Sequence, residues 1–157
     1  MKKICLRNQQ RDQRVNSRLL RQITAWVLDE PLGLDSYSLS IALVNASKMA
    51  QVNGQFLEHE GSTDIITFDY NEGYEFADQS LKINGDLYIS IPDAVHQADE
   101  FETSWQEELA RYVIHGILHL LGFDDLVPTK RRIMKAEENR LVKLVRRKFN
   151  LANLSSN

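Results

Sequence analysis

Two histidines lie four residues apart and are followed by a glycine and two aspartates. These residue types at this spacing are suited to binding a metal ion. His115 and His119 lie in the stretch RYVIHGILHLLGFDD. Because positions i and i+4 share one face of an α-helix, both imidazoles can point at one ion. Gly122 can adopt a positive φ and turn the chain, so that Asp125 or Asp124 supplies a third ligand. We favour Asp125 as that ligand, with Asp124 as the alternative.

The spacing matches a zinc signature of hydrolytic enzymes. The pattern H-x3-H-x2-G-x2-D has the spacing of the long zinc signature of metzincin proteases, whose third ligand is usually histidine. A catalytic zinc ion takes three protein ligands and keeps its fourth position for water. In the HExxH motif the residue after the first histidine is the glutamate base, and here that residue is Gly116. The pattern therefore predicts a divalent-metal site and argues against peptidase chemistry. Zinc is the expected ion, and nickel, manganese or iron would also suit these ligands.

Apolar periodicity predicts the elements that position this site. The predicted strands span residues 3–6, 37–44, 65–70 and 85–90, and three predicted helices span 15–28, about 92–102 and about 129–148. On the last of these helices, the residues expected to face inwards are Ile133, Leu141, Leu144 and Val145. A further helix follows the cap Asn45, and the histidine helix follows the capping box that starts at Ser104. The order β, α, β, α, β, β, α, α, α predicts an α+β fold with one small mixed four-stranded sheet and about five helices. The histidine helix is apolar on nearly every face, which predicts that it is the buried central helix.

Length and composition indicate one globular domain over residues 1–157. Hydrophobic residues make up 43% of the chain and charged residues 26%, which is typical of a folded domain rather than a disordered one. No apolar run approaches the roughly eighteen residues that span a bilayer, and the N-terminal segment does not resemble a signal peptide. Cys5, the only cysteine, excludes an internal disulfide and is expected to be buried in the first strand. We therefore expect a cytoplasmic protein with no membrane contact.

The net charge of −3 hides a strong segregation of charge along the chain. Residues 2–21 carry seven Lys or Arg and one acid, residues 58–108 carry fourteen acids and one base, and residues 130–148 carry nine bases and two acids. If the two basic segments lie side by side in the fold, they form a positive surface that suits a polyanion. The alternative is that they are the solvated faces of two terminal helices.

Several segments resemble one family. HGILHLLGFD, residues 115–124, resembles the HGxLHLxGYD signature of the YbeY-type rRNA maturation factors, which are bacterial metal-dependent endoribonucleases. Asn53, Phe56 and the run TDIITF at 63–68 resemble the family's N-x-x-Y-R segment and its following strand, and GDLYIS at 85–90 resembles its GDI-type strand. The resemblance implies a single-strand-specific endoribonuclease that acts in rRNA maturation and ribosome quality control. Its implied partners are rRNA, the ribosome and, among proteins, ribosomal proteins or an assembly GTPase.

Two departures from the family pattern affect the site. The family's third histidine ligand is replaced by Asp125, and the arginine that follows the family's aromatic residue is replaced by Leu57. His59 is the nearest substitute for that arginine, and Arg111 is another base that can supply its charge. Asp124, if it is not a ligand, can orient a ligand histidine or take a proton.

The candidate roles follow from the motif and the resemblance together. They are a catalytic role for Asp124 and His59, metal binding by His115, His119 and Asp125, and substrate binding by Thr63, Asp64 and Arg111. Thr63 and Asp64 resemble residues that line the family's cleft. Two other functions remain open: a non-catalytic ribosome assembly factor with a bound metal, and a metal-dependent hydrolase of another bond.

Overall fold

The computed structural model of the chain describes residues 1–57, 64–72 and 77–155. The strands are β1 (Lys2–Asn8), β2 (Tyr37–Val44), β3 (Ile65–Asp69) and β4 (Ile83–Ser90). The helices are α1 (Ser17–Asp29), α2 (Ala46–Leu57), α3 (Ile91–Phe101), α4 (Trp105–Leu120) and α5 (Pro128–Lys148), and a 3₁₀ helix, η1 (Leu151–Ser155), follows them. The predicted α+β fold and its order of elements are confirmed. None of the described helices is long and apolar enough to cross a membrane.

The sheet is mixed, as expected, with strand order β1-β2-β4-β3. β1 pairs with β2 and β2 pairs with β4 in parallel, whereas β3 pairs with β4 antiparallel. Each parallel pair requires a long crossover connection, which α1 provides for the first pair and α2 with β3 for the second. β3 and β4 form a hairpin, which places the end of β4, and hence α3, beside the start of β3.

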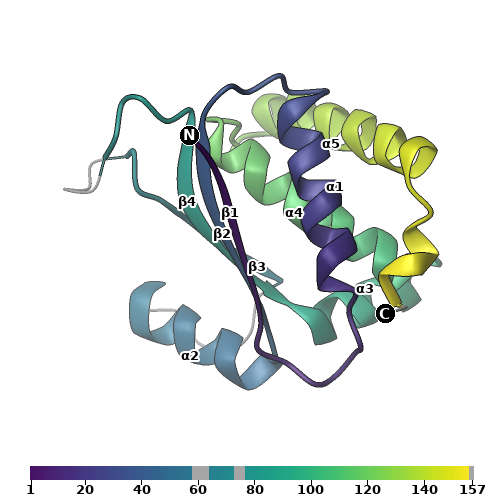
Figure 1. Ribbon diagram of the computed structural model, residues 1–157. Coiled ribbons are helices and arrows are strands. Elements are labelled where there is room, and N and C mark those ends of the chain that lie inside the picture. Colours follow the sequence, from purple (N-terminus) through teal and green to yellow (C-terminus); the bar gives the residue numbers. More distant parts are fainter. Residues whose placement is uncertain (58–63, 73–76, 156–157) are drawn as a thin grey trace.

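Helices lie on both faces of the sheet (Figure 1), and the hydrophobic core on one face is larger than the core on the other. Successive residues of a strand point to opposite faces, so Ile41 and Leu43 of β2 enter the large core while Ala42 and Val44 enter the small one. The helices α1, α4 and α5 cover the large core. Of the described helices, only α2 covers the small core, through Met49 and Val52 among others. The site is therefore built on the face that three helices cover.

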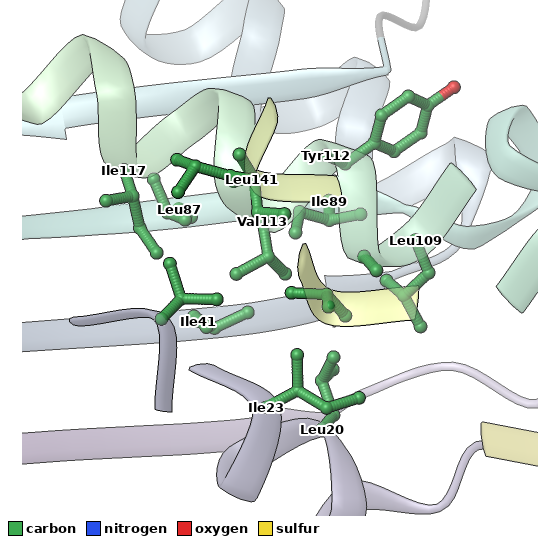
Figure 2. Packing of buried hydrophobic residues seen from close by; sticks show 14 of the residues in the cluster. Leu20, Ile23, Ile41, Leu87, Ile89, Leu109, Tyr112, Val113, Ile117 and Leu141 are labelled. Carbon is green, nitrogen blue, oxygen red and sulfur yellow. The ribbon is translucent and has the colours of Figure 1, made fainter. Parts of the chain in front are cut away.

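The histidine helix α4 is the buried central helix that its sequence predicts. It contacts β3, β4, α1, α3, α5 and η1, and Figure 2 shows Val113 and Ile117 packed among Leu87, Ile89 and Leu141. Ser104 caps its first turn by accepting a hydrogen bond from Glu107 N at 3.1 Å. Gly122 ends the following turn with φ of 102°, a conformation that L side chains rarely adopt. A capped start and a glycine turn thus fix both ends of the element that carries the histidines.

The expected burial of Cys5 is wrong. Ile4 and Leu6 face the large core from β1, so Cys5 points to the opposite face of the sheet and is exposed. On that face α2 contacts β4, and no described helix packs on β1, which is an edge strand. The strand is correct, but within the described part of the chain its outer face has no covering layer.

The expected inward orientation of Ile133 is also wrong. Ile133 is 62% exposed, and its neighbour Met134 occupies the buried position instead. The buried stripe of α5 consists of Met134, Glu138, Leu141, Val142 and Val145. One of these five residues, Glu138, is an acid, and it lies at the candidate functional site.

Candidate metal centre

Three side chains from α4 and the turn after it converge on one point. Nε2 of His115 and Nε2 of His119 lie 3.1 Å apart. Oδ2 of Asp125 lies 3.6 Å from each of these nitrogens. The helix places the histidines one turn apart on the same face, and the turn at Gly122 brings the chain back so that Asp125 faces both. These are the residues that the sequence predicts as ligands, and they form a possible metal-binding group.

The spacing of the three atoms fits a divalent ion such as zinc. Metal–ligand bonds of about 2.0–2.2 Å at tetrahedral angles place neighbouring ligand atoms about 3.3 Å apart. The observed separations of 3.1, 3.6 and 3.6 Å bracket that value. Two imidazole nitrogens and one carboxylate oxygen form one face of a tetrahedron, so a fourth position remains for water or substrate.

The second nitrogen of each imidazole has a partner that can only accept a hydrogen bond. Nδ1 of His115 lies 2.7 Å from Oε1 of Glu138, and Nδ1 of His119 lies 3.2 Å from the carbonyl oxygen of Phe123. A carboxylate and a carbonyl have no proton to give, so each Nδ1 carries the ring proton. Each Nε2 therefore presents a lone pair to the point where the three side chains meet, which is the arrangement that metal-bound histidines adopt.

Glu138 is the residue of the candidate site that the sequence interpretation missed. It is only 3% exposed, and its carboxylate also accepts hydrogen bonds from Arg111 Nη1 and Lys135 Nζ, each at 3.0 Å. Burial raises the pKa of this carboxyl, but hydrogen bonds from His115, Lys135 and Arg111 outweigh burial and lower the pKa to about 2. The sequence does contain a sign of its role. Glu138 lies four residues after Met134 in the apolar stripe of α5, and an acid at a buried position requires a partner.

A cleft of about 550 Å³ opens beside the metal-binding group. His115 and Asp125 line it, and so do residues from the start of β3, α3, the segment before α4, and α5. The others are Asp64, Ile65, Gln97, Phe101, Thr103, Glu108, Arg111, Tyr112, Arg131, Met134, Lys135, Glu138 and Asn139. The cleft combines exposed cations with the large apolar ring of Phe101, which is 59% exposed. Its charged lining consists of the cations Arg111, Arg131 and Lys135 and the carboxylates Asp64, Glu108, Asp125 and Glu138.

The structure places the remaining candidate residues as follows. Asp64 and Arg111 line the cleft, as their predicted contact with substrate requires. Asp124 accepts a hydrogen bond from Leu126 N at 2.8 Å and lines a separate surface hollow. It is not one of the three converging ligands, and its catalytic role stays a prediction. His59 and Thr63 lie outside the described residues.

Comparison with known proteins assigns the chain to a family. The family described as Endoribonuclease YbeY matches residues 5–146. Among proteins named Endoribonuclease YbeY, one from Parabacteroides distasonis is 39% identical over 127 residues, covering 80% of this chain and 84% of that protein. Another from Bacteroides fragilis is 40% identical over 122 residues, covering 76% and 83%. A Thermotoga maritima protein solved in solution shares the fold, with a TM-score of 0.66 and 23% identity over 98% of this chain and 95% of its own. The chain therefore belongs to the endoribonuclease YbeY family.

Proposed function

We propose that this endoribonuclease hydrolyses single-stranded RNA with one divalent metal ion, zinc in the first instance, and that its substrate is ribosomal RNA. The observation that carries the proposal is the convergence of His115, His119 and Asp125 at the wall of the cleft. The ribosomal substrate, a role in ribosome quality control, and contacts with ribosomal proteins or an assembly GTPase follow from the family resemblance.

Different residues of the chain would bind the metal, bind the substrate and transfer protons in such a reaction. His115, His119 and Asp125 would hold the ion, which when bound supplies a Lewis acid for a phosphoryl oxygen and an acidified water. Exposed Arg131 and Lys135 place positive charge at the cleft, where it offsets the charge of the RNA backbone. Asp64, Thr63 and Arg111 would contact the substrate, and His59 would transfer protons. Asp124, which lines a separate hollow, would have to turn toward the cleft to take that role.

The packing of Gly116 counts against peptide hydrolysis. A Cβ at this position would lie 2.6 and 2.8 Å from the two Cδ atoms of Leu87 and 3.0 Å from Cδ1 of Ile65. The position next to the first histidine therefore faces the sheet, and α4 has no room there for the glutamate base of an HExxH protease.

The openness of the metal-binding group counts against a purely structural ion. Structural zinc sites are closed by four protein ligands. Within the described part of the chain the group has three, and side-chain exposures of 25%, 26% and 39% for His115, His119 and Asp125 leave it open to solvent. A catalytic ion with a vacant position fits this arrangement better.

Elemental analysis combined with an RNA cleavage assay tests the proposal. Wild type should carry about one equivalent of zinc or another divalent metal and should cleave single-stranded RNA. Asp125→Ala should lose most of the metal and the cleavage activity, whereas Asp124→Ala should keep the metal because its carboxylate points elsewhere. The proposal would be contradicted if the wild-type protein carried no metal and bound neither added zinc nor added nickel. Metal-loaded protein that leaves RNA intact would favour the non-catalytic assembly factor.

A further inference from the structure

We propose that Glu138 is the positioning residue of the metal centre. Its carboxylate fixes the direction in which His115 presents Nε2, and Arg111 and Lys135 clamp that carboxylate in place. The inference rests on the proposed metal-dependent function and adds residues from α5 to a site that the sequence motif confines to α4 and its turn.

Both oxygens of Glu138 are engaged. Oε1 lies 2.7 Å from Nδ1 of His115. Oε2 accepts hydrogen bonds from Arg111 Nη1 and Lys135 Nζ at 3.0 Å each. Because the carboxylate is held from both sides and its side chain is only 4% exposed, it cannot rotate without losing a charged partner. The ring of His115 is therefore locked through its Nδ1 proton.

Arg111 is held as firmly as Glu138. Its guanidinium also donates to Asn139 Oδ1 at 2.8 Å and lies 3.8 Å from Glu107 and 3.9 Å from Glu108. Arg111 stands one helical turn before His115 on α4, and Glu138 and Asn139 stand on α5, so this cation braces the two helices at the level of the metal-binding group. Three carboxylates surround Arg111, and that of Glu138 is the nearest, so we assign Arg111 first to holding Glu138.

The two histidines are oriented by different means. The backbone carbonyl of Phe123 holds His119, so no side-chain substitution removes that contact directly. A side-chain carboxylate on another helix holds His115, and that contact can be removed. Loss of such a partner typically weakens metal affinity or activity by roughly 10- to 100-fold.

The test compares Glu138→Ala and Glu138→Gln with Glu137→Gln. Glu137 precedes Glu138 on α5 but pairs with Arg140 on the helix surface, which makes it a matched control. Zinc affinity, measured by competition with a chelating dye, should fall roughly 10- to 100-fold in Glu138→Ala. It should fall less in Glu138→Gln, whose amide oxygen can still accept from Nδ1, and should stay at the wild-type value in Glu137→Gln.

Steady-state kinetics of the Glu138 variants distinguish a loss of His115 positioning from a general loss of structure. At limiting zinc, the Glu138 variants should lose kcat with little change in KM for RNA, and excess zinc should restore kcat. If Glu138→Ala fails to fold, Arg111→Met removes one of the two cations that hold Glu138, and zinc affinity, measured without RNA, should fall several-fold. Wild-type zinc affinity in folded Glu138 variants would overturn the positioning role while leaving the metal-dependent function intact. Failure of wild type to bind zinc would overturn both.

Discussion

Among single residues, the proposed third ligand, Asp125, distinguishes this candidate metal centre from the family signature, which has histidine there. Asp125 provides an anionic oxygen on a short side chain, 3.6 Å from both histidine nitrogens. Zinc accepts imidazole as readily as carboxylate. We therefore expect Asp125→His to retain zinc, whereas Asp125→Asn, which keeps the shape but loses the charge, should bind at least about tenfold more weakly. Isothermal titration of metal-free protein measures both affinities. If Asp125→His loses as much affinity as Asp125→Asn, the turn accommodates only a short anionic ligand.

The lowered pKa of Glu138 predicts how stability depends on pH. The carboxyl ionises near pH 2 in the folded protein, against an ordinary value of 4.5. A depressed folded-state pKa contributes stability that is complete above about pH 4.5 and is lost as the pH falls towards 2. A shift of this size corresponds to an effect of the order of 3 kcal/mol. Urea unfolding of metal-free protein should therefore show a large difference between wild type and Glu138→Gln at pH 7, and a much smaller one near pH 2.5. A difference that stays constant over this range would contradict the assignment.

Among the elements, α4 packs closely against β4 at Gly116, the residue next to His115. A methyl group on Gly116 would meet the Leu87 side chain at 2.6 Å. Gly116→Ala should therefore destabilise the protein by roughly 1–3 kcal/mol through overpacking, even though alanine is the better helix former. Thermal unfolding measures the loss. Leu87→Ala removes the clashing atoms, so the double variant should be more stable than the sum of the single effects predicts. Strict additivity would show that the contact does not limit the packing.

The elements themselves were largely predictable because their signals are local. Alternation marked the strands, Ser104 and Gly122 marked the ends of the histidine helix, and the i, i+4 spacing marked the ligands. The register of an exposed helix was less secure, and Ile133 was placed one position away from the buried stripe that begins at Met134. Burial of a strand residue such as Cys5 depends on whether a second layer covers that face, which no local pattern reveals.

The network around Glu138 could not be predicted, for a different reason. His115 and Glu138 are separated by 23 residues, and their contact exists only because α4 and α5 pack side by side. Glu138 lies beside a second acid, Glu137, in a segment with nine bases, so from the sequence it looks like part of a solvated face. Only the packing of the two helices shows that this acid points inwards and that Arg111 is committed to it.

At the scale of the whole molecule, the fold brings the two basic ends of the chain together. α1 contacts both α5 and η1, as Figure 1 shows. Asn16 N donates to the carbonyl of Leu154 at 2.7 Å, and the rings of Trp26 and Phe149 meet edge to face at 5.8 Å. The condition set by the charge pattern is therefore met, because α1, which carries part of the basic N-terminal segment, contacts the basic helix α5. The acidic segment also reaches this helix, since Glu107 forms an ion pair with Arg146 at 3.1 Å.

This neighbourhood predicts that RNA binding depends on salt and on which cation is changed. Arg18 on α1 and Arg147 on α5 are both exposed, and neither forms an ion pair with another described residue. Each phosphate neutralised on a single strand contributes about 0.7 to the slope of log affinity against log salt. Arg18→Glu and Arg147→Glu should each lower that slope by about this amount, with RNA binding measured by fluorescence anisotropy in the presence of a chelator to prevent cleavage. Lys82→Glu makes the same change in net charge at the only base among residues 58–108 and should leave the slope unchanged. An equal effect of all three substitutions would show that RNA senses the total charge of the protein rather than a surface formed by α1 and α5.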